Sequence, residues 1–203
     1  MMVFEATPFE GELVRLRRAV PADVEDRFRW NNAPQVMEFL PRGAVPSTRE
    51  EILAYLNRAA ANRDDLIELA IETREGRHIG GTVLRGFDWK ARKCEFGIMI
   101  GEPDFWGKGY GTEVTQLLLS MAFDSLNLNR VWLTVDAANE KGIRAYKKAG
   151  FVEEGRLRAD RYLRGAYGDT LVMGVLRSEW EAGRGGTAGL GGAADGEAGG
   201  RVS

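Results

Sequence analysis

The sequence predicts one α+β domain, of mixed α/β character, around a partly antiparallel central sheet. Three observations carry this prediction. The 203 residues are enough for one sizeable core. Three strand-like runs follow one another in the middle of the chain, with only short polar segments between them. The strict alternation of strand and helix that builds a doubly wound parallel sheet is not seen.

The first part of the chain is expected to form a strand and then a helical region. In chain order these segments are a strand at 13–19, a helix at 21–32 and a helix within 46–63. Ser47 and Glu50 stand three residues apart and predict a capping box at the start of the last of these helices. Ile52, Leu53 and Leu56 give that helix an apolar face.

The second part is expected to complete the sheet. The segments are strands at 66–73, 78–89 and 93–101, a helix after 111, a strand at 130–136, a helix at 139–149 and two strands at 151–158 and 169–176. Gly150 is placed to end the second of these helices. From Gly183 onward, nine of 21 residues are glycine and few are large and apolar. We therefore expect a domain at 1–182 and a disordered tail at 183–203.

Composition excludes several classes of protein. Lys and Arg total 28 against 30 for Asp and Glu, so the formal charge of −2 does not indicate a nucleic-acid-binding protein. Cys94 and His78 are the only cysteine and histidine, which leaves no disulfide and no cluster of soft metal ligands. The first residues lack the pattern of a secretory signal, and no run is long and apolar enough to cross a bilayer. The predicted location is the cytoplasm, without membrane, nucleic-acid or metal partners.

One short segment, EPDFWGKGYGTEV at 102–114, places glycine at 107, 109 and 111 just before a predicted helix. Glycines spaced in this way leave backbone N–H groups open to close approach, and the helix N-terminus adds partial positive charge. The segment therefore predicts a site for phosphate. Its spacing fits neither the Walker A loop nor the dinucleotide-binding fingerprint. The structural alternative is a tight turn between strand and helix.

Two segments in this order, EFGIMIGEPDFWGKGYGTEV at 95–114 and NRVWLTVDAANEKGIRAYKKAGF at 129–151, closely resemble the GNAT superfamily of acyl-CoA-dependent N-acetyltransferases. The RimJ/RimL branch, which includes bacterial spermidine N-acetyltransferases, is the most similar. The resemblance extends from Leu13 to Trp180. It implies a mostly antiparallel, splayed central sheet flanked by helices.

The resemblance also implies how acetyl-CoA binds. In the family, a Gln/Arg-x-x-Gly-x-Gly/Ala loop holds the diphosphate on its backbone N–H groups. The matching loop here has Trp106 in place of Gln or Arg. The preceding strand pairs its backbone with the pantetheine arm. The implied cofactor-binding residues are Ile98, Met99, Ile100, Trp106, Gly107, Lys108, Gly109, Tyr110, Gly111, Thr112, Asn139, Lys141 and Lys148.

Two catalytic residues are implied. Tyr146 matches the tyrosine that gives a proton to the departing thiolate of CoA, and Glu95 matches a strand carboxylate that takes the proton of the amine. The alternatives are a tyrosine packed on the apolar side of its helix and a glutamate that pairs or anchors substrate. For Asn139 the alternative to cofactor binding is a helix N-cap.

We therefore expect direct transfer of an acetyl group from acetyl-CoA to a primary amine: a protein N-terminus, a polyamine or another small amine. The chain is also expected to be able to form a homodimer. A catalytically silent domain that binds or senses acyl-CoA on the same fold is the second hypothesis. A nucleotide-binding protein whose glycine loop holds ATP is the third.

Overall fold

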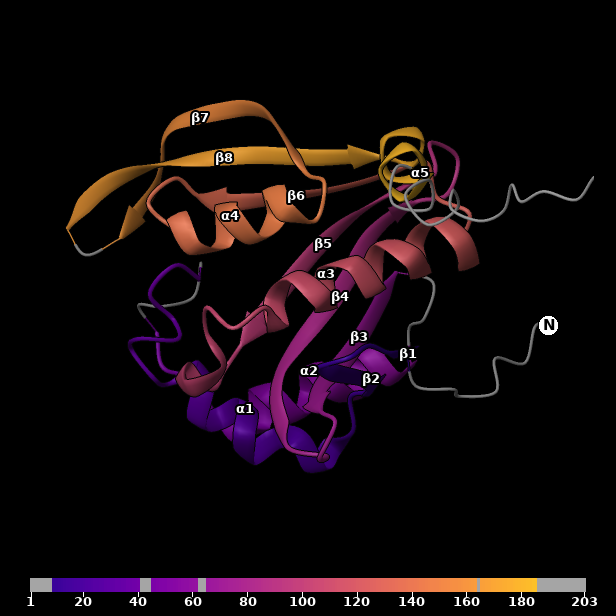
Figure 1. Ribbon diagram of the computed structural model, residues 1–203. Coiled ribbons are helices and arrows are strands. Elements are labelled where there is room, and N and C mark those ends of the chain that lie inside the picture. The colour runs from indigo at the N-terminus through magenta and orange to yellow at the C-terminus, as the bar shows by residue number, and fades with distance from the viewer. Residues whose placement is uncertain (1–8, 41–44, 62–64, 164, 186–203) are drawn as a thin grey trace, which may run out of the picture.

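The computed structural model describes residues 9–40, 45–61, 65–163 and 165–185. These residues form an eight-stranded open sheet with helices on both faces (Figure 1). The elements are β1 (Phe9–Glu10), β2 (Val14–Arg18), η1 (Pro21–Asp23), α1 (Val24–Asn31), α2 (Arg49–Ala61), β3 (Leu66–Thr73), β4 (His78–Asp88), β5 (Lys93–Ile100), η2 (Pro103–Phe105), α3 (Tyr110–Ser120), η3 (Met121–Ser125), β6 (Arg130–Asp136), α4 (Glu140–Lys148), β7 (Val152–Leu163), β8 (Ala166–Leu176) and α5 (Arg177–Gly185).

The strand order is β1-β2-β3-β4-β5-β6-β8-β7, and every neighbouring pair is antiparallel except β5 and β6. These two strands run parallel and pair only where Lys93, Cys94 and Glu95 lie opposite Arg130 to Trp132. Beyond that point β6 pairs with β8 alone along its remaining length. The sheet therefore splays open between β5 and β6, and the predicted fold class is confirmed.

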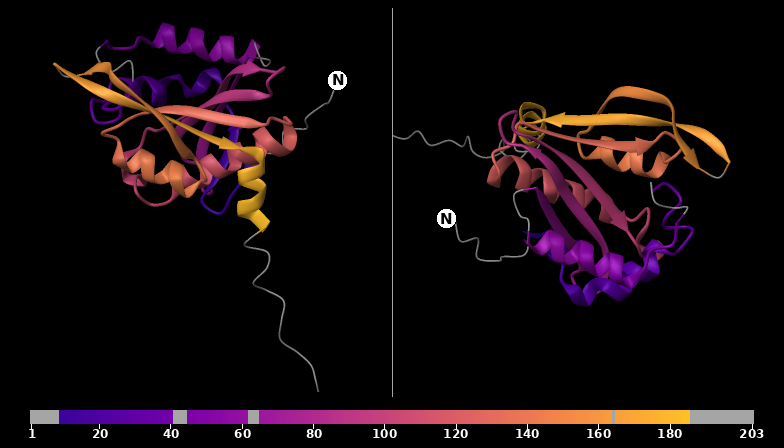
Figure 2. Two further views of the ribbon diagram at one scale, coloured as in Figure 1. Left: turned by 90° about the horizontal axis from the view of Figure 1, so that it is seen from above. Right: turned by 180° about the vertical axis from the view of Figure 1, so that it is seen from behind.

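The main core lies between one face of the sheet and the helices α3 and η3. Alternate residues of β6, namely Val131, Leu133 and Val135, point into this core, as the period of a strand requires. Helices α1 and α2 cover the opposite face; Figure 2 shows α2 and α4 on different sides of the sheet. Among the described residues, no helix combines the length and the apolar character that a membrane span requires.

The capping box of α2 lies one residue later than predicted. Thr48 donates its backbone N–H to Glu51 Oε2 at 3.0 Å, and the N–H of Glu51 donates to Thr48 Oγ1 at 3.2 Å. The predicted pair of Ser47 and Glu50 is wrong because Ser47 is held outside the helix. Its backbone N–H and carbonyl both bond the side-chain amide of Asn32, at 3.0 and 3.1 Å.

Two further details differ from the sequence-based expectation. Leu53 is 38% exposed, so the buried face of α2 consists of Ile52, Leu56 and Ala59 instead. Helix α5 was not predicted, because its polar and glycine-rich sequence carries little signal. Its only large apolar side chain, Trp180, packs against the core with a ring distance of 5.3 Å to Phe123. The helix includes the first three residues of the predicted tail, and residues 186–203 lie outside the described part.

Helix α3 is tied to the first strands by Glu113 in its first turn. The carboxylate accepts three backbone hydrogen bonds, from the N–H groups of Glu12, Leu13 and Val14 at 2.7, 2.9 and 2.9 Å. Gly11 leaves the space for it, because a Cβ there would lie 2.4 Å from Glu113 Cδ. This contact fixes the start of α3, which the glycine loop precedes.

Replacement of this carboxylate tests the anchor. Glu113→Ala is expected to lower the free energy of unfolding by about 2 kcal/mol, because three N–H groups lose a charged acceptor. Urea denaturation measures the change. Glu50→Ala, at an exposed position on α2, is the matched control and should change the free energy by less than about 0.5 kcal/mol. Equal losses in the two variants would contradict an anchoring role for Glu113.

Candidate active site

The splay between β5 and β6 opens a cavity of about 750 Å³, the first cavity. Its walls are the end of β5, the loop and first turn of α3, helix α4 and the segment that follows α1. The cavity exists because β6 leaves β5 after three paired residues. Most of the predicted site residues therefore lie around an open cleft.

Backbone N–H groups of the glycine loop face no protein acceptor. Gly107 and Gly109 have φ angles of +71° and +94°, a conformation that side chains disfavour. Gly109 is the N-cap of α3, so the first N–H groups of that helix have no intrahelical partner. For the N–H groups of residues 107–112, no acceptor occurs among the described residues. A row of free donors at a helix N-terminus is suited to an anion.

The same loop leaves room for that anion. No protein atom lies within 4 Å of the point where a Cβ would stand on Gly107 or Gly111, although both residues line the cavity. For Gly109 the nearest atom is Leu13 Cδ1 at 3.4 Å. Trp106 fixes the loop from the other side, because its indole Nε1–H donates to the carbonyl of Ile100 at 2.8 Å. A diphosphate therefore fits this cradle on the side that faces the cavity.

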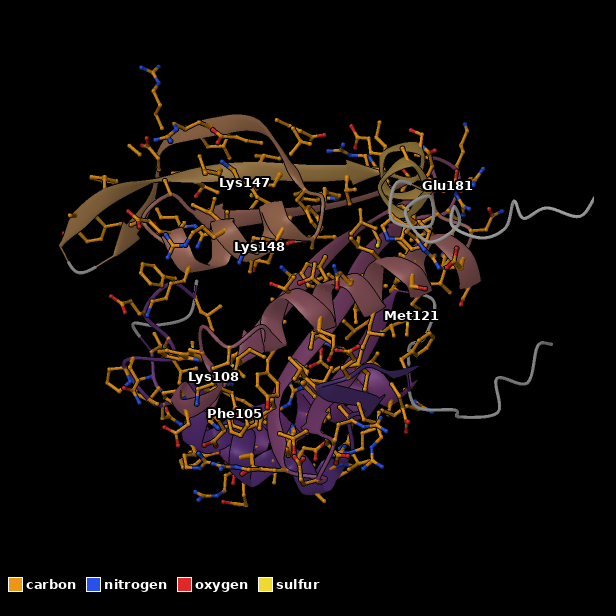
Figure 3. The ribbon with its side chains drawn as sticks, in the orientation of Figure 1. Phe105, Lys108, Met121, Lys147, Lys148 and Glu181 are labelled. Carbon is orange, nitrogen blue, oxygen red and sulfur yellow. The ribbon has the colours of Figure 1, made fainter. Side chains whose placement is uncertain are left out.

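Positive side chains border the cleft. Lys141, Arg144 and Lys148 of α4 line the cavity, and Arg144 is partly neutralised by Glu140 at 3.2 Å. In Figure 3, Lys148 is labelled on α4 and Lys108 on the loop before α3. These charges raise the attraction for a phosphorylated ligand, and salt screens exposed charges of this kind.

Two residues of β5 turn backbone groups toward the cleft; the carbonyl of the second, Ile100, is taken by Trp106, which leaves its N–H. The carbonyl of Gly97 accepts a hydrogen bond of 3.0 Å from a threonine hydroxyl of β4, and the carbonyl of Met99 lies against Gly80 of the same strand. Since backbone direction alternates along a strand, Ile98 and Ile100 turn their groups away from β4. Beyond Glu95, β6 no longer pairs with β5. The geometry thus favours Ile98 and Ile100, rather than Met99, for contact with an extended ligand.

Tyr146 lies on α4 at the inner end of the cleft. Its ring packs edge-on against Phe96, with 6.2 Å between centroids, and against Phe151 at 6.0 Å. Its hydroxyl has no hydrogen-bond partner among the described residues. Burial raises the pKa of Tyr146 to about 12, so the phenol keeps its proton throughout the neutral range.

Asn139 and Glu95 both have structural partners. Asn139 is the N-cap of α4, and its Oδ1 accepts the N–H of Gly142 at 3.0 Å, which leaves only the amide nitrogen for a ligand. Glu95 is bound by Arg85, whose Nε and Nη2 lie 3.1 and 2.6 Å from the two carboxylate oxygens. Asn139 therefore has the structural role of a helix N-cap and Glu95 that of an ion-pair partner, in addition to any role in function.

A second cavity of about 620 Å³ lies on the α1 and α2 side of the sheet. Its walls share residues with those of the first cavity, and these form the junction between the two: Phe39, Leu40, Ile98, Met99, Asn139 and Tyr146. Two ligands that enter from opposite faces of the sheet would meet at this junction. The arrangement suits transfer of a group between them.

The structure gathers most of the predicted site residues in one place. Twelve of them line the first cavity, and Glu95 lines only the second. Lys108 is exposed beside the loop, and Tyr110 packs edge-on against Phe105 at 5.0 Å; neither lines a cavity. Among the described residues, no group of three or more histidine, cysteine or acidic side chains could hold a metal ion.

Sequence reasoning missed two parts of the site. The segment from Gln35 to Leu40 lines the first cavity although it lies far away in sequence. Asp136 lines the second cavity at the end of β6. An acidic residue at a buried position of an otherwise apolar strand was a visible signal for Asp136. No local pattern marks the Gln35–Leu40 segment.

Comparison with known families decides the relationship. Residues 14–152 match the family described as acetyltransferase (GNAT) domain, over more than half of the chain. The chain belongs to the GNAT family. The glycine cradle, the splayed strands and the tyrosine at the junction are thus parts of a GNAT domain.

Three similar proteins illustrate the relationship. Spermidine N(1)-acetyltransferase of Escherichia coli (strain K12) is 36% identical over 108 residues, which are 53% of this chain and 58% of that protein. The SPbeta prophage-derived uncharacterized N-acetyltransferase YokL of Bacillus subtilis (strain 168) is 31% identical over 68% of this chain and 86% of its own. Spermidine N-acetyltransferase from Vibrio cholerae, in a crystal structure with CoA and spermine, superposes with a TM-score of 0.77. It is 26% identical over 84% of this chain and 99% of its own. The chain thus spans little more than half the length of the Escherichia coli enzyme.

Proposed function

We propose that this GNAT domain transfers an acetyl group from acetyl-CoA to a primary amine. One observation carries the proposal: a cradle of unpartnered backbone N–H groups opens into a cleft that ends at the protonated hydroxyl of Tyr146. A ligand with a diphosphate at one end and a thioester at the other matches both features. The Vibrio cholerae relative with bound CoA supports this assignment.

Each part of the chain has a distinct task in this reaction. Acetyl-CoA supplies the activated thioester. The N–H groups at 107–112 hold the diphosphate. The backbone of Ile98 and the N–H of Ile100 orient the arm, and these N–H groups can donate to the carbonyl oxygen as it gains negative charge. Tyr146 holds a proton on its hydroxyl for the sulfur that departs. Glu95, bound by Arg85, holds one wall of the second cavity.

The second cavity suits an acceptor with few charges. Four acidic side chains line it, Glu51, Glu68, Glu95 and Asp136, and four arginines balance them, at positions 27, 58, 85 and 161. A polyamine carries several positive charges and requires an excess of acids. We therefore propose a primary amine with a single ammonium group as the acceptor, in preference to spermidine.

Release of CoA thiol tests the function and the acceptor together. Purified protein is incubated with acetyl-CoA and a panel of amines that includes spermidine, singly charged alkylamines and a short peptide with a free N-terminus. We expect thiol release that depends on amine and is fastest with a singly charged one. Faster turnover of spermidine would overturn the acceptor assignment alone. Binding of CoA by calorimetry, without turnover of any amine, would favour the silent sensor.

The homodimer and the cytoplasmic location stay predictions. The tip of the β7–β8 hairpin exposes Tyr162 and Tyr167, which are 62% and 73% accessible and pack edge-on at 5.0 Å. Exposed paired aromatic rings are frequent at contacts between proteins. Sedimentation of the purified chain gives its mass in solution, and a monomer at micromolar concentration would contradict the dimer.

A further inference from the structure

The end of β6 carries a buried carboxylate, Asp136, that has no positively charged partner. Five carboxylates are buried in the described part of the chain. Four of them form ion pairs with arginine side chains: Asp23, Glu68, Glu72 and Glu102. Asp136 is 8% exposed and forms no ion pair with any described residue. A largely buried carboxylate that the fold does not pair with a cation calls for an explanation, and a function is one.

One oxygen of Asp136 has a structural task and the other is free. Oδ1 accepts a hydrogen bond of 2.8 Å from the backbone N–H of Ala138, in the turn that leads to α4. Oδ2 has no partner among the described residues. Among the described residues, one side-chain polar atom is fully buried without a hydrogen-bond partner, and it is Arg27 Nε. Asp136 Oδ2 also lacks a partner, so it is not fully buried. Asp136 lines the second cavity, and Oδ2 is its oxygen without a hydrogen-bond partner among the described residues.

Asp136 lies beside the junction of the two cavities. It is three residues before Asn139, which lines both, and it lines only the second. Val135 points into the core, so alternation turns Asp136 and Thr134 toward the face that α1 and α2 cover. Tyr146 lines the second cavity as well, so an amine held there would lie in a cavity that Asp136 and Tyr146 share.

Other charged groups on these walls are engaged. Glu95 is bound at both oxygens by Arg85. Glu68 is bound by Arg27 and by the hydroxyl of Tyr55. These contacts leave neither carboxylate as free as Asp136 Oδ2.

The three remaining charged side chains of the second cavity lie on α2 and β7. Glu51 accepts the N–H of Thr48 at 3.0 Å. Arg58 stands over the ring of Tyr55 at 5.6 Å, and Arg161 donates to Thr170 Oγ1 at 2.9 Å. Neither arginine is paired with Asp136.

We propose that Asp136 is the general base that takes the proton of the attacking amine, an inference that rests on the proposed acetyl transfer. The acceptor ammonium first loses one proton to water. Its nitrogen then forms the new C–N bond and becomes acidic, and Asp136 Oδ2 takes the second proton. The C–S bond breaks, sulfur receives the proton of Tyr146, and Asp136 returns its proton through water to the tyrosinate. Amide, thiol and one released proton balance the reaction.

The variant Asp136→Asn separates the proposed role as general base from the structural role, which is to accept the backbone N–H of Ala138. Asparagine keeps the carbonyl oxygen that accepts the Ala138 N–H but has no basic oxygen. We expect kcat to fall about 100-fold, within the range for general bases, while affinity for CoA stays within about twofold. The variant without ligand should unfold at an equal or higher temperature, because a buried unpaired charge is removed. Glu95→Gln is the matched control and should keep a larger part of kcat.

The outcomes are distinct. Wild-type kcat in Asp136→Asn, or a larger loss in Glu95→Gln, would overturn the assignment of the base. A lower unfolding temperature in Asp136→Asn would mean that the carboxylate is structural. Asp136→Ser, whose hydroxyl can also accept the Ala138 N–H, replaces the first variant if that one does not fold. Absence of turnover in the wild-type protein would instead remove the proposed function itself.

Discussion

Tyr146→Phe is expected to lower kcat by at least about 100-fold and to leave affinity for CoA within about twofold. We propose that the phenol, which lines both cavities, protonates the sulfur, and general acids contribute about 10²- to 10⁴-fold. Phenylalanine keeps the packing against Phe96 and Phe151, so the cleft should keep its shape. Thiol release at saturating acetyl-CoA measures kcat, and calorimetry measures affinity.

The control for this variant is Tyr167→Phe, at an exposed position of the hairpin tip, which should keep wild-type kcat. Equal activity of Tyr146→Phe and the wild-type protein would remove Tyr146 from the mechanism. The pKa gives a second check. Because burial raises the pKa of Tyr146 to about 12, the acid form persists well above pH 9. The rate should rise with pH as the free amine forms and should not fall below about pH 10; a fall between pH 8 and 9 would contradict this assignment.

Gly111→Val is expected to weaken the binding of CoA by at least about 100-fold, which corresponds to about 2.7 kcal/mol. Gly111 lies in the first turn of α3 without a positive φ, and no protein atom is within 4 Å of a Cβ there. The valine therefore fits the folded chain, and its side chain occupies the space in front of the free N–H groups. Calorimetric titration with CoA measures the loss.

Its control is Gly183→Val in α5, where, beyond its neighbours in the helix, no described atom lies within 4 Å of a Cβ and the residue lines neither cavity. Both variants should keep an unfolding temperature close to that of the wild-type protein. The control should bind CoA with unchanged affinity. Equal affinity in Gly111→Val and the wild-type protein would place the diphosphate elsewhere.

Local sequence was informative where local physics decides the outcome. The alternation of side chains predicted the strands, and the helix expected after residue 111 is α3, because both kinds of pattern bury one face. Glycine at 107 and 109 indicated a positive φ, which the structure has. The capping box of α2 was placed one residue early, since a distant asparagine, Asn32, decides which residue begins the helix.

Properties of the site that depend on residues far away in the sequence could not be predicted from local sequence patterns. Glu95 and Asp136 are both strand acids, and nothing in their neighbours in sequence tells them apart. Arg85 of the adjacent strand forms an ion pair with the first, and the second forms no ion pair with any described residue. Helix α5 was missed for a similar reason, because contacts of Trp180, Arg177 and Arg184 with distant residues hold a segment of weak helical signal.

The sequence by itself determined the family, the order of the elements and the cradle at the start of α3, because each is written in the spacing of a short continuous segment. The tertiary structure alone decided that β6 leaves β5 after three paired residues and that two cavities meet at Tyr146. It also decided which carboxylate lacks a cation. The physical reason is that pairing and burial of charge depend on groups that only the folded chain brings within a few ångströms of one another.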